Sequence, residues 1–140
     1  MVPRAHVLPA LVLDAFDSLN LSKLVDETRL LNFATKVQNG YDVNVHYHND
    51  LHGADVMQIG HYMIRNCQLH EVLNLNSLDC LSFLIACVAH DLGHDGFTNS
   101  YHVNAVTKRA IESNDTSVQE TFHAAELFRI LSQKEYNFVE

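Results

Sequence analysis

Residues 78–91 read LDCLSFLIACVAHD, and this stretch decides the fold of the chain. Before His90 it contains only Asp79 and Ser82 as polar side chains, so a helix here is apolar on almost every side and belongs in a core. His90 and Asp91 follow at the end of that helix, where an ionised carboxylate is costly to desolvate without strong partners. A bound divalent metal accepts a neutral imidazole and a carboxylate together. The stretch therefore predicts a buried helix that ends at a metal site.

Helical periodicity also dominates on both sides of this stretch, and no alternating strand pattern competes with it. The predicted helices are Ser22–Gln38, a helix that starts at 49–51 and ends at Arg65, Ser77–His90, Asn99–Ile111 and Ser117–Ser132. Ser22 and Ser77 are expected to be N-caps, and Ser117 and Glu120 have the spacing of a capping box. The predicted fold class is all-α.

Composition limits the kind of protein that this chain can be. With 140 residues, 47% of them hydrophobic, it can form one core but is short for an enzyme with an enclosed two-metal site. The net charge of −8 argues against nucleic acid as a partner, because no basic stripe could neutralise phosphates. A small anionic substrate stays compatible with this charge, since bound divalent cations reverse the sign of the local field.

The cysteines and the apolar N-terminal stretch bear on location. The cysteines are Cys67, Cys80 and Cys87. Their odd number and the lack of a Cys-x-x-Cys pair favour a reducing compartment over a disulfide framework. The apolar stretch Val7–Phe16 is interrupted by Pro9, is too short to span a bilayer and is not followed by a signal-peptide cleavage pattern. We expect no membrane span and a soluble, cytoplasmic location.

Histidines and carboxylates gather in the first of two short motifs, residues 47–56. His48 and His52 are four residues apart, so in a helix they share one face, and Asp55 follows on the same stripe. Two such imidazoles can be metal ligands, or one ligand and one proton donor. The alternative is a polar surface stripe with scattered histidines.

The second motif, residues 90–99, places His94 one helical turn after His90. Gly93 and Gly96 favour a bend that would bring several ligands to one point. The alternative is a helix C-terminus at which histidines complement the helix dipole. Glu120 and His123 form a third histidine–carboxylate pair, which alone could be a solvated pair on a helix. Together the pairs indicate a metal-dependent hydrolase.

These motifs resemble the signatures of class I 3′,5′-cyclic-nucleotide phosphodiesterase catalytic domains, which belong to the His-Asp metal phosphohydrolases. Residues 47–56 match Y-H-N-x-x-H-A/G-x-D-V at every fixed position. Residues 90–101 match H-D-x-x-H-x-G-x-x-N-x-aromatic. Residues 114–123 match N-D-x-S-V-L-E-x-x-H, except that Gln119 replaces the leucine. The resemblance covers about residues 33–131.

The resemblance implies a two-metal site of Zn²⁺ and Mg²⁺ (or Mn²⁺) and a role for each motif residue. The implied roles are His52, His90 and Asp91 as zinc ligands, with Asp91 also bridging to the second metal; His48 as the general acid on the departing 3′ oxygen; His94, Glu120 and His123 as holders of metal-bound water; Asp55 as an orienting partner; and Tyr47 as part of the substrate pocket.

The resemblance also implies that residues 1–140 are the N-terminal part of a single catalytic domain, a truncated His-Asp phosphohydrolase-type bundle without an internal boundary. Family domains continue with a further aspartate ligand of the zinc, a purine-binding glutamine and an aromatic clamp. The expected reaction of the complete domain is hydrolysis of a cyclic nucleoside 3′,5′-monophosphate to the 5′-monophosphate. The expected partners are this substrate and the C-terminal half, or another protein, which would cover an apolar helix face. The alternatives are a non-catalytic phosphodiesterase-like module in a larger assembly and a different His-Asp phosphohydrolase.

Overall fold

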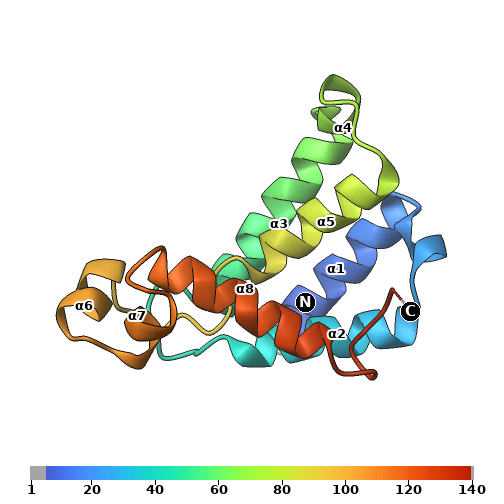
Figure 1. Cartoon of the computed structure of the whole chain (residues 1–140). Coiled ribbons are helices and arrows are strands. Elements are labelled where there is room, and N and C mark those ends of the chain that lie inside the picture. Colours follow the sequence, from blue (N-terminus) through green and yellow to red (C-terminus); the bar gives the residue numbers. More distant parts are fainter. Residues whose placement is uncertain (1–5, 140) are drawn as a thin grey trace.

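The computed structural model describes residues 6–139, and this part of the chain is helical without strands, which confirms the predicted all-α class (Figure 1). Its elements are α1 (Val7–Ser18), the 3-10 turn η2 (Leu21–Leu24), α2 (Glu27–Gly40), α3 (Asp50–Arg65), α4 (Leu69–Val72), α5 (Ser77–Ala89), α6 (Asn99–Asn104), α7 (Lys108–Glu112) and α8 (Val118–Leu131).

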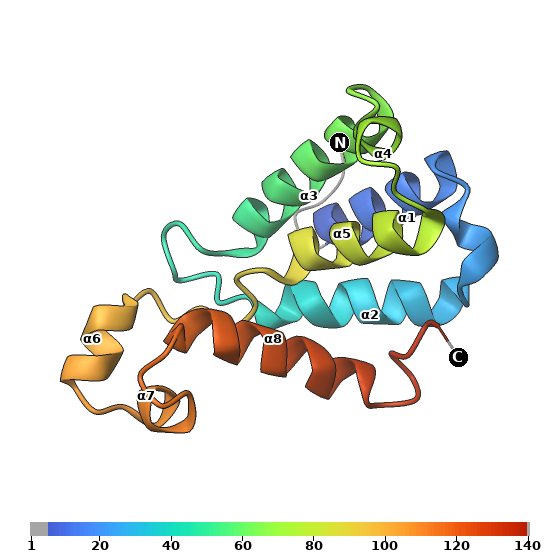
Figure 2. The same cartoon turned by 45° about the horizontal axis from the view of Figure 1, so that its top comes forward.

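The predicted apolar helix, α5, packs against α3, α1 and α8 and contributes Leu84 and Val88 to the core. Helix α1 lies against both α2 and α3, and α8 contacts α2 (Figures 1 and 2). Helices α6 and α7 lie together at one end of the molecule, beside the start of α8 (Figure 2). Among the described residues, no helix is both long and apolar enough to cross a membrane.

Helix α1 lies outside the helices predicted from the sequence. Its residues Leu8, Val12, Ala15 and Phe16 are fully buried, at the spacing of one helix face. Pro9 does not interrupt it, because the proline lies in the first turn, where the backbone N–H groups have no partner within the helix.

Two predicted N-caps are wrong. Helix α2 begins at Glu27, because the Asp26 side chain accepts a hydrogen bond from Arg29 N at 2.9 Å, while Ser22 lies in the preceding 3-10 turn. Helix α5 is capped by Asn76 rather than Ser77, in a capping box closed by Asp79. In each case another side chain has the better-placed oxygen: a carboxylate four residues after Ser22, and an amide one residue before Ser77.

The segment between residues 99 and 118 also differs from the prediction. The helix predicted over residues 99–111 is divided into α6 and α7, because Val106 adopts φ 50° and the Thr107 hydroxyl then caps α7. The predicted Ser117 capping box does not form. Ser117 has φ 43° without a side-chain cap, and Gln119 N at the start of α8 instead donates to Asn99 Oδ1 at 2.8 Å.

Small residues let α3 lie close to its neighbours. A Cβ atom on Gly60 would be 2.8 Å from Cys87 Sγ on α5, and one on Gly53 would be 3.0 Å from the Tyr41 ring. The Tyr41 hydroxyl passes α3 and donates to Val88 O on α5 at 3.0 Å. Since α3 and α5 run in opposite directions (Figure 1), this packing places the first turn of α3 beside the last turn of α5.

Candidate metal centre

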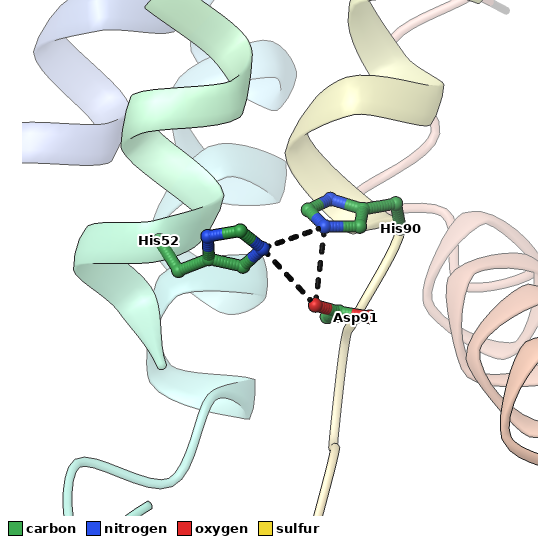
Figure 3. A group of neighbouring side chains, drawn as sticks. All are labelled: His52, His90 and Asp91. Atoms are coloured by element: carbon green, nitrogen blue, oxygen red, sulfur yellow. Dashed lines mark hydrogen bonds and ion pairs between the residues drawn. The ribbon is translucent and has the colours of Figure 1, made fainter. Parts of the chain in front are cut away.

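The three residues expected to be zinc ligands converge where α3 and α5 meet (Figure 3). His52 extends from the first turn of α3, His90 caps the C-terminus of α5, and Asp91 is the next residue. The Nε2 atoms of His52 and His90 are 3.1 Å apart. Asp91 Oδ2 lies 3.3 Å from Nε2 of His52 and 3.1 Å from Nε2 of His90.

The spacing and chemistry of these atoms fit a zinc ion. Tetrahedral zinc with bonds of about 2.0–2.1 Å separates its ligand atoms by about 3.3 Å. His90 Nδ1 lies 2.8 Å from Cys87 O and donates to it, so the neutral ring carries its lone pair on Nε2. That lone pair faces another imidazole nitrogen and a carboxylate oxygen, an arrangement that requires a cation or a proton between them.

The charges in this cluster are strongly coupled. Burial opposes ionisation of Asp91, but the hydrogen bond that it accepts from protonated His90 and the nearby imidazoles together lower its pKa to about 2. The same hydrogen bond to Asp91 raises the pKa of His90, whereas burial and the neighbouring His90 lower the pKa of His52. Asp91 is therefore ionised at neutral pH, as a metal ligand must be.

On the other side of Asp91, His94 and His123 each have Nδ1 in a hydrogen bond, so Nε2 is a donor in one ring and an acceptor in the other. Gly96 N donates to His94 Nδ1 at 2.9 Å, so the His94 proton is on Nε2. His123 Nδ1 lies 2.8 Å from Leu92 O and donates to it, which leaves Nε2 as an acceptor. Burial lowers the pKa of both rings and keeps them neutral.

His123 Nε2 is a buried atom without a hydrogen-bond partner in the described part of the chain, and it lies 3.9 Å from Asp91 Oδ1. Two facing acceptors, one of them charged, are unfavourable without a donor or a cation between them. The second oxygen of Asp91 therefore also faces a position suited to a metal or to metal-bound water.

His48 lies at the entrance to this side of the site. It precedes α3, whose N-cap Asn49 accepts a hydrogen bond from Leu51 N. Its Nε2 is 4.0 Å from Asp91 Oδ2, and more than a third of its side chain is exposed. An adjoining cavity of about 290 Å³ is lined by His48, Asp91, His94, Gly96, Phe97, Thr98, Asn99, Gln119, Glu120 and His123.

The structure places the remaining predicted site residues at the edge of this centre. Glu120 lines the cavity and accepts from Asn99 Nδ2 at 3.0 Å. Tyr47 is 65% exposed and does not line the cavity, and its ring packs against His52 with centroids 4.6 Å apart. Asp55 is exposed, and its charge acts on His52 without a direct hydrogen bond.

Three histidines outside the two motifs form hydrogen bonds away from the proposed zinc ligands. His61 Nε2 lies 2.8 Å from Ser18 Oγ, and His70 Nδ1 lies 2.9 Å from Ile64 O. His102 is buried between α6 and α7, where Nδ1 is 3.0 Å from Thr107 Oγ1. His46, which directly precedes the first motif, is exposed.

Sequence reasoning did not identify three residues that support the cavity wall: Asp95, Arg109 and Gln119. The only signal in the sequence was Gln119 itself, because a polar residue occupies the leucine position of the third signature.

Comparisons with known proteins agree with this geometry. The family model described as 3′5′-cyclic nucleotide phosphodiesterase matches residues 47–140. The chain is 36% identical over 135 residues to the 3′,5′-cyclic-nucleotide phosphodiesterase regA of Dictyostelium discoideum, covering 95% of this chain and 17% of that protein. It is 39% identical over 108 residues to the dual specificity calcium/calmodulin-dependent 3′,5′-cyclic nucleotide phosphodiesterase 1 of Drosophila melanogaster, covering 76% of this chain and 13% of that protein.

The fold is also similar to that of a solved phosphodiesterase domain, from the rhodopsin phosphodiesterase of Salpingoeca rosetta. The TM-score is 0.84 at 31% identity, and the match covers 95% of this chain but 40% of the solved chain. The chain thus spans about two fifths of the solved chain. The matched family model, the similar relatives and the shared fold make this chain a member of the 3′,5′-cyclic nucleotide phosphodiesterase family.

Proposed function

We propose that this chain is the metal-binding part of an enzyme that hydrolyses a cyclic nucleoside 3′,5′-monophosphate to the 5′-monophosphate. The observation that carries the proposal is the convergence of His52, His90 and Asp91 beside a cavity into which His48 faces. The relatives named as cyclic-nucleotide phosphodiesterases support the substrate class.

The two oxygens of Asp91 support a two-metal site. Oδ2 faces His52 and His90, which suits Zn²⁺, and Oδ1 faces the His123 side of the cavity, which suits Mg²⁺ or Mn²⁺ with water ligands. Such a metal pair supplies an activated water and polarises the phosphoryl group.

The neighbouring side chains have separate proposed tasks. His48 protonates the departing 3′ oxygen, since it borders the cavity and lies farther from Asp91 Oδ2 than His52 and His90 do. His94 presents an N–H group to the cavity, while His123 and Glu120 present acceptors, and these three hold water bound to the metals. Tyr47 supports the rings of His52 and His48, and Asp55 adds negative charge near His52.

We further propose that residues 1–140 are one part of a single catalytic domain, whose remainder packs on the exposed side of α3. Ile59, Tyr62 and Met63 lie on one face of α3 and are exposed, as is Leu78 at the start of α5. Apolar side chains gathered in this way mark an interaction surface. The match to only 40% of a solved phosphodiesterase domain supports the rest of the domain as the occupant.

The proposed location is the cytoplasm. Cys80 is buried, Cys87 is half-buried, and burial raises the pKa of both free thiols, which makes them unreactive. Free thiols of this kind are typical of reducing compartments.

The direct test measures hydrolysis of cyclic AMP and cyclic GMP by the longest expressible form of the protein with Zn²⁺ and Mg²⁺. Release of the 5′-monophosphate, abolished by Asp91→Ala and retained by the surface variant Asp17→Ala, is the expected result. Stoichiometric metal binding without hydrolysis of either nucleotide would instead identify a non-catalytic phosphodiesterase-like module.

A further inference from the structure

A partly buried polar cluster lies at the cavity wall, outside the proposed ligands. It consists of Asp95, Arg109 and Gln119, from the turn after α5, from α7 and from α8. Gln119 is only 4% exposed, and its whole amide is used. Its Nε2 donates to Asp95 Oδ1 and to Phe97 O, each at 2.9 Å, and its Oε1 accepts from Arg109 Nη1 at 2.7 Å.

Arg109 connects this cluster to two further points. Its Nη2 donates to Gly93 O at 3.0 Å, and its Nη1 lies 3.4 Å from Asp95 Oδ2. The guanidinium group also stacks on Phe122, 3.6 Å from the ring centroid. Arg109 therefore holds the turn after α5 against the first turns of α8.

The residues that the polar cluster holds lie next in the chain to residues that line the cavity. His94, for example, lies between Gly93 and Asp95. The Gly93 carbonyl accepts a hydrogen bond from Arg109, and the Asp95 side chain accepts one from Gln119. Glu120 follows Gln119, and Asn99 joins the two because it accepts from Gln119 N and donates to Glu120.

The same holds for His123, which also lines the cavity. His123 follows Phe122, on which Arg109 stacks. His94, Glu120 and His123 thus each lie next to a residue that this cluster holds, either by hydrogen bonds or by the contact of Arg109 with the Phe122 ring.

The cluster is a departure from the signature of the family, because Gln119 occupies a leucine position. A leucine could make none of the three hydrogen bonds of the Gln119 amide. A buried amide is tolerated only when its donors and acceptors are satisfied, and here all of them are. The polar cluster is therefore a built feature of this chain.

We propose that Asp95, Arg109 and Gln119 are positioning residues that set His94, Glu120 and His123 at their places opposite Asp91. The structural part of this inference stands on the contacts above. Its catalytic consequence, a role in the turnover number and not in substrate affinity, rests on the proposed function.

The structural part is tested by nuclear magnetic resonance on the 140-residue chain. In Gln119→Leu we expect shifts of the Gly96 amide, which donates to His94, and of the ring nitrogens of His94 and His123. In Arg109→Lys, which keeps the charge but loses the simultaneous bonds to Gln119 and Gly93, we expect smaller shifts of the same resonances. The control is Asn76→Ala, which removes the cap at the opposite end of α5 and should lower the melting temperature without moving these resonances.

Unchanged site resonances in both cluster variants, with a lowered melting temperature, would overturn the proposal and leave the cluster a purely stabilising role. If Gln119→Leu does not fold, Arg109→Lys decides by the same resonances. In a form that hydrolyses cyclic nucleotide, Gln119→Leu should lower kcat by about 10-fold or more and leave KM within about twofold, since small displacements of catalytic groups cost up to about 10²-fold in rate. A wild-type protein without hydrolysis would refute the proposed function, while the resonance shifts would still decide the positioning role.

Discussion

The imidazole of His48 stacks on that of His94, with ring centroids 4.0 Å apart and an angle of 15° between the planes. This contact holds His48 beside the cavity, where its Nε2 lies 4.0 Å from Asp91 Oδ2. The orientation of His94 is itself determined by the Gly96 N–H group. The proposed acid is thus positioned by a second ring whose own place is determined by the backbone.

His48→Ala should therefore slow hydrolysis by about 10²–10⁴-fold, as expected for loss of a general acid, without loss of metal. Turnover and metal content of an active form are the measurements, with His46→Ala as the matched control, because His46 is exposed nearby. A substrate whose leaving group needs little protonation should recover most of the lost rate. Loss of metal, or equal losses on both substrates, would mean that His48 is a ligand.

Asp91→Ala should remove metal and activity together, because both carboxylate oxygens face proposed metal positions. Loss of a group that only supports a metal ligand lowers metal affinity by about 10–100-fold, and loss of a ligand shared by two metals should lower it at least as much. Metal analysis after dialysis and turnover on two substrates test this prediction. In contrast to His48→Ala, the Asp91→Ala variant should recover little of its lost rate on a substrate with a better leaving group. Full metal content in the variant would contradict the ligand role.

Asp95 should make the fold sensitive to acid. Burial opposes its ionisation, but hydrogen bonds from Gln119 and Phe97 and the charge of Arg109 outweigh burial and lower its pKa below 3.8. A lowered pKa in the folded state gives stability that is complete above the unfolded pKa and is lost as pH falls through the folded pKa. Urea unfolding of wild type and Asp95→Asn should be compared from about pH 6 to pH 2. The difference between their free energies of unfolding should become smaller as the pH falls. Parallel stability curves would show that Asp95 gains nothing from its partners.

Gly93→Ala should destabilise the chain more than Gly96→Ala. Both glycines have positive φ, 74° and 87°, which costs an alanine about 1–2 kcal/mol. A Cβ on Gly93 would also lie 3.0 Å from the Phe122 ring, whereas one on Gly96 would meet only Val45 at 3.8 Å. We expect losses of about 2–4 kcal/mol and about 1–2 kcal/mol, measured by urea unfolding. Equal losses would show that Phe122 moves away freely.

The 140-residue chain alone should be a poor catalyst. Only three protein groups converge on the proposed zinc position in its described part, and its turnover should fall well below the roughly 1–10³ s⁻¹ of ordinary enzymes. Sedimentation should also show self-association that the exposed-face variant Met63→Glu reduces. Turnover at an ordinary rate by this chain alone would show that its site is complete.

Local patterns made most of the long helices predictable, and the resemblance of the motifs to the family signatures made the ligand set predictable. The apolar residues before His90 favour a core helix by composition, and each of the two histidine motifs is confined to a short stretch of sequence. Helix boundaries were less predictable, because partners far along the chain decide some of them. Gln119 N at the start of α8, for example, is satisfied by Asn99 and not by the local Ser117.

The sequence by itself determined an all-α protein, because helix periodicity is a local property. It also led to His52, His90 and Asp91 as expected metal ligands, because the motifs that contain them resemble the family signatures. Only the tertiary structure decided which atoms face one another: the lone pair of His90 toward His52, the unpartnered Nε2 of His123 toward Asp91, and the bonds of Gln119 to Asp95 and Arg109. Such relations depend on how the helices pack. The close approach of α3 and α5 at Gly60, and the turn at Gly93 and Gly96, determine the directions of these side chains.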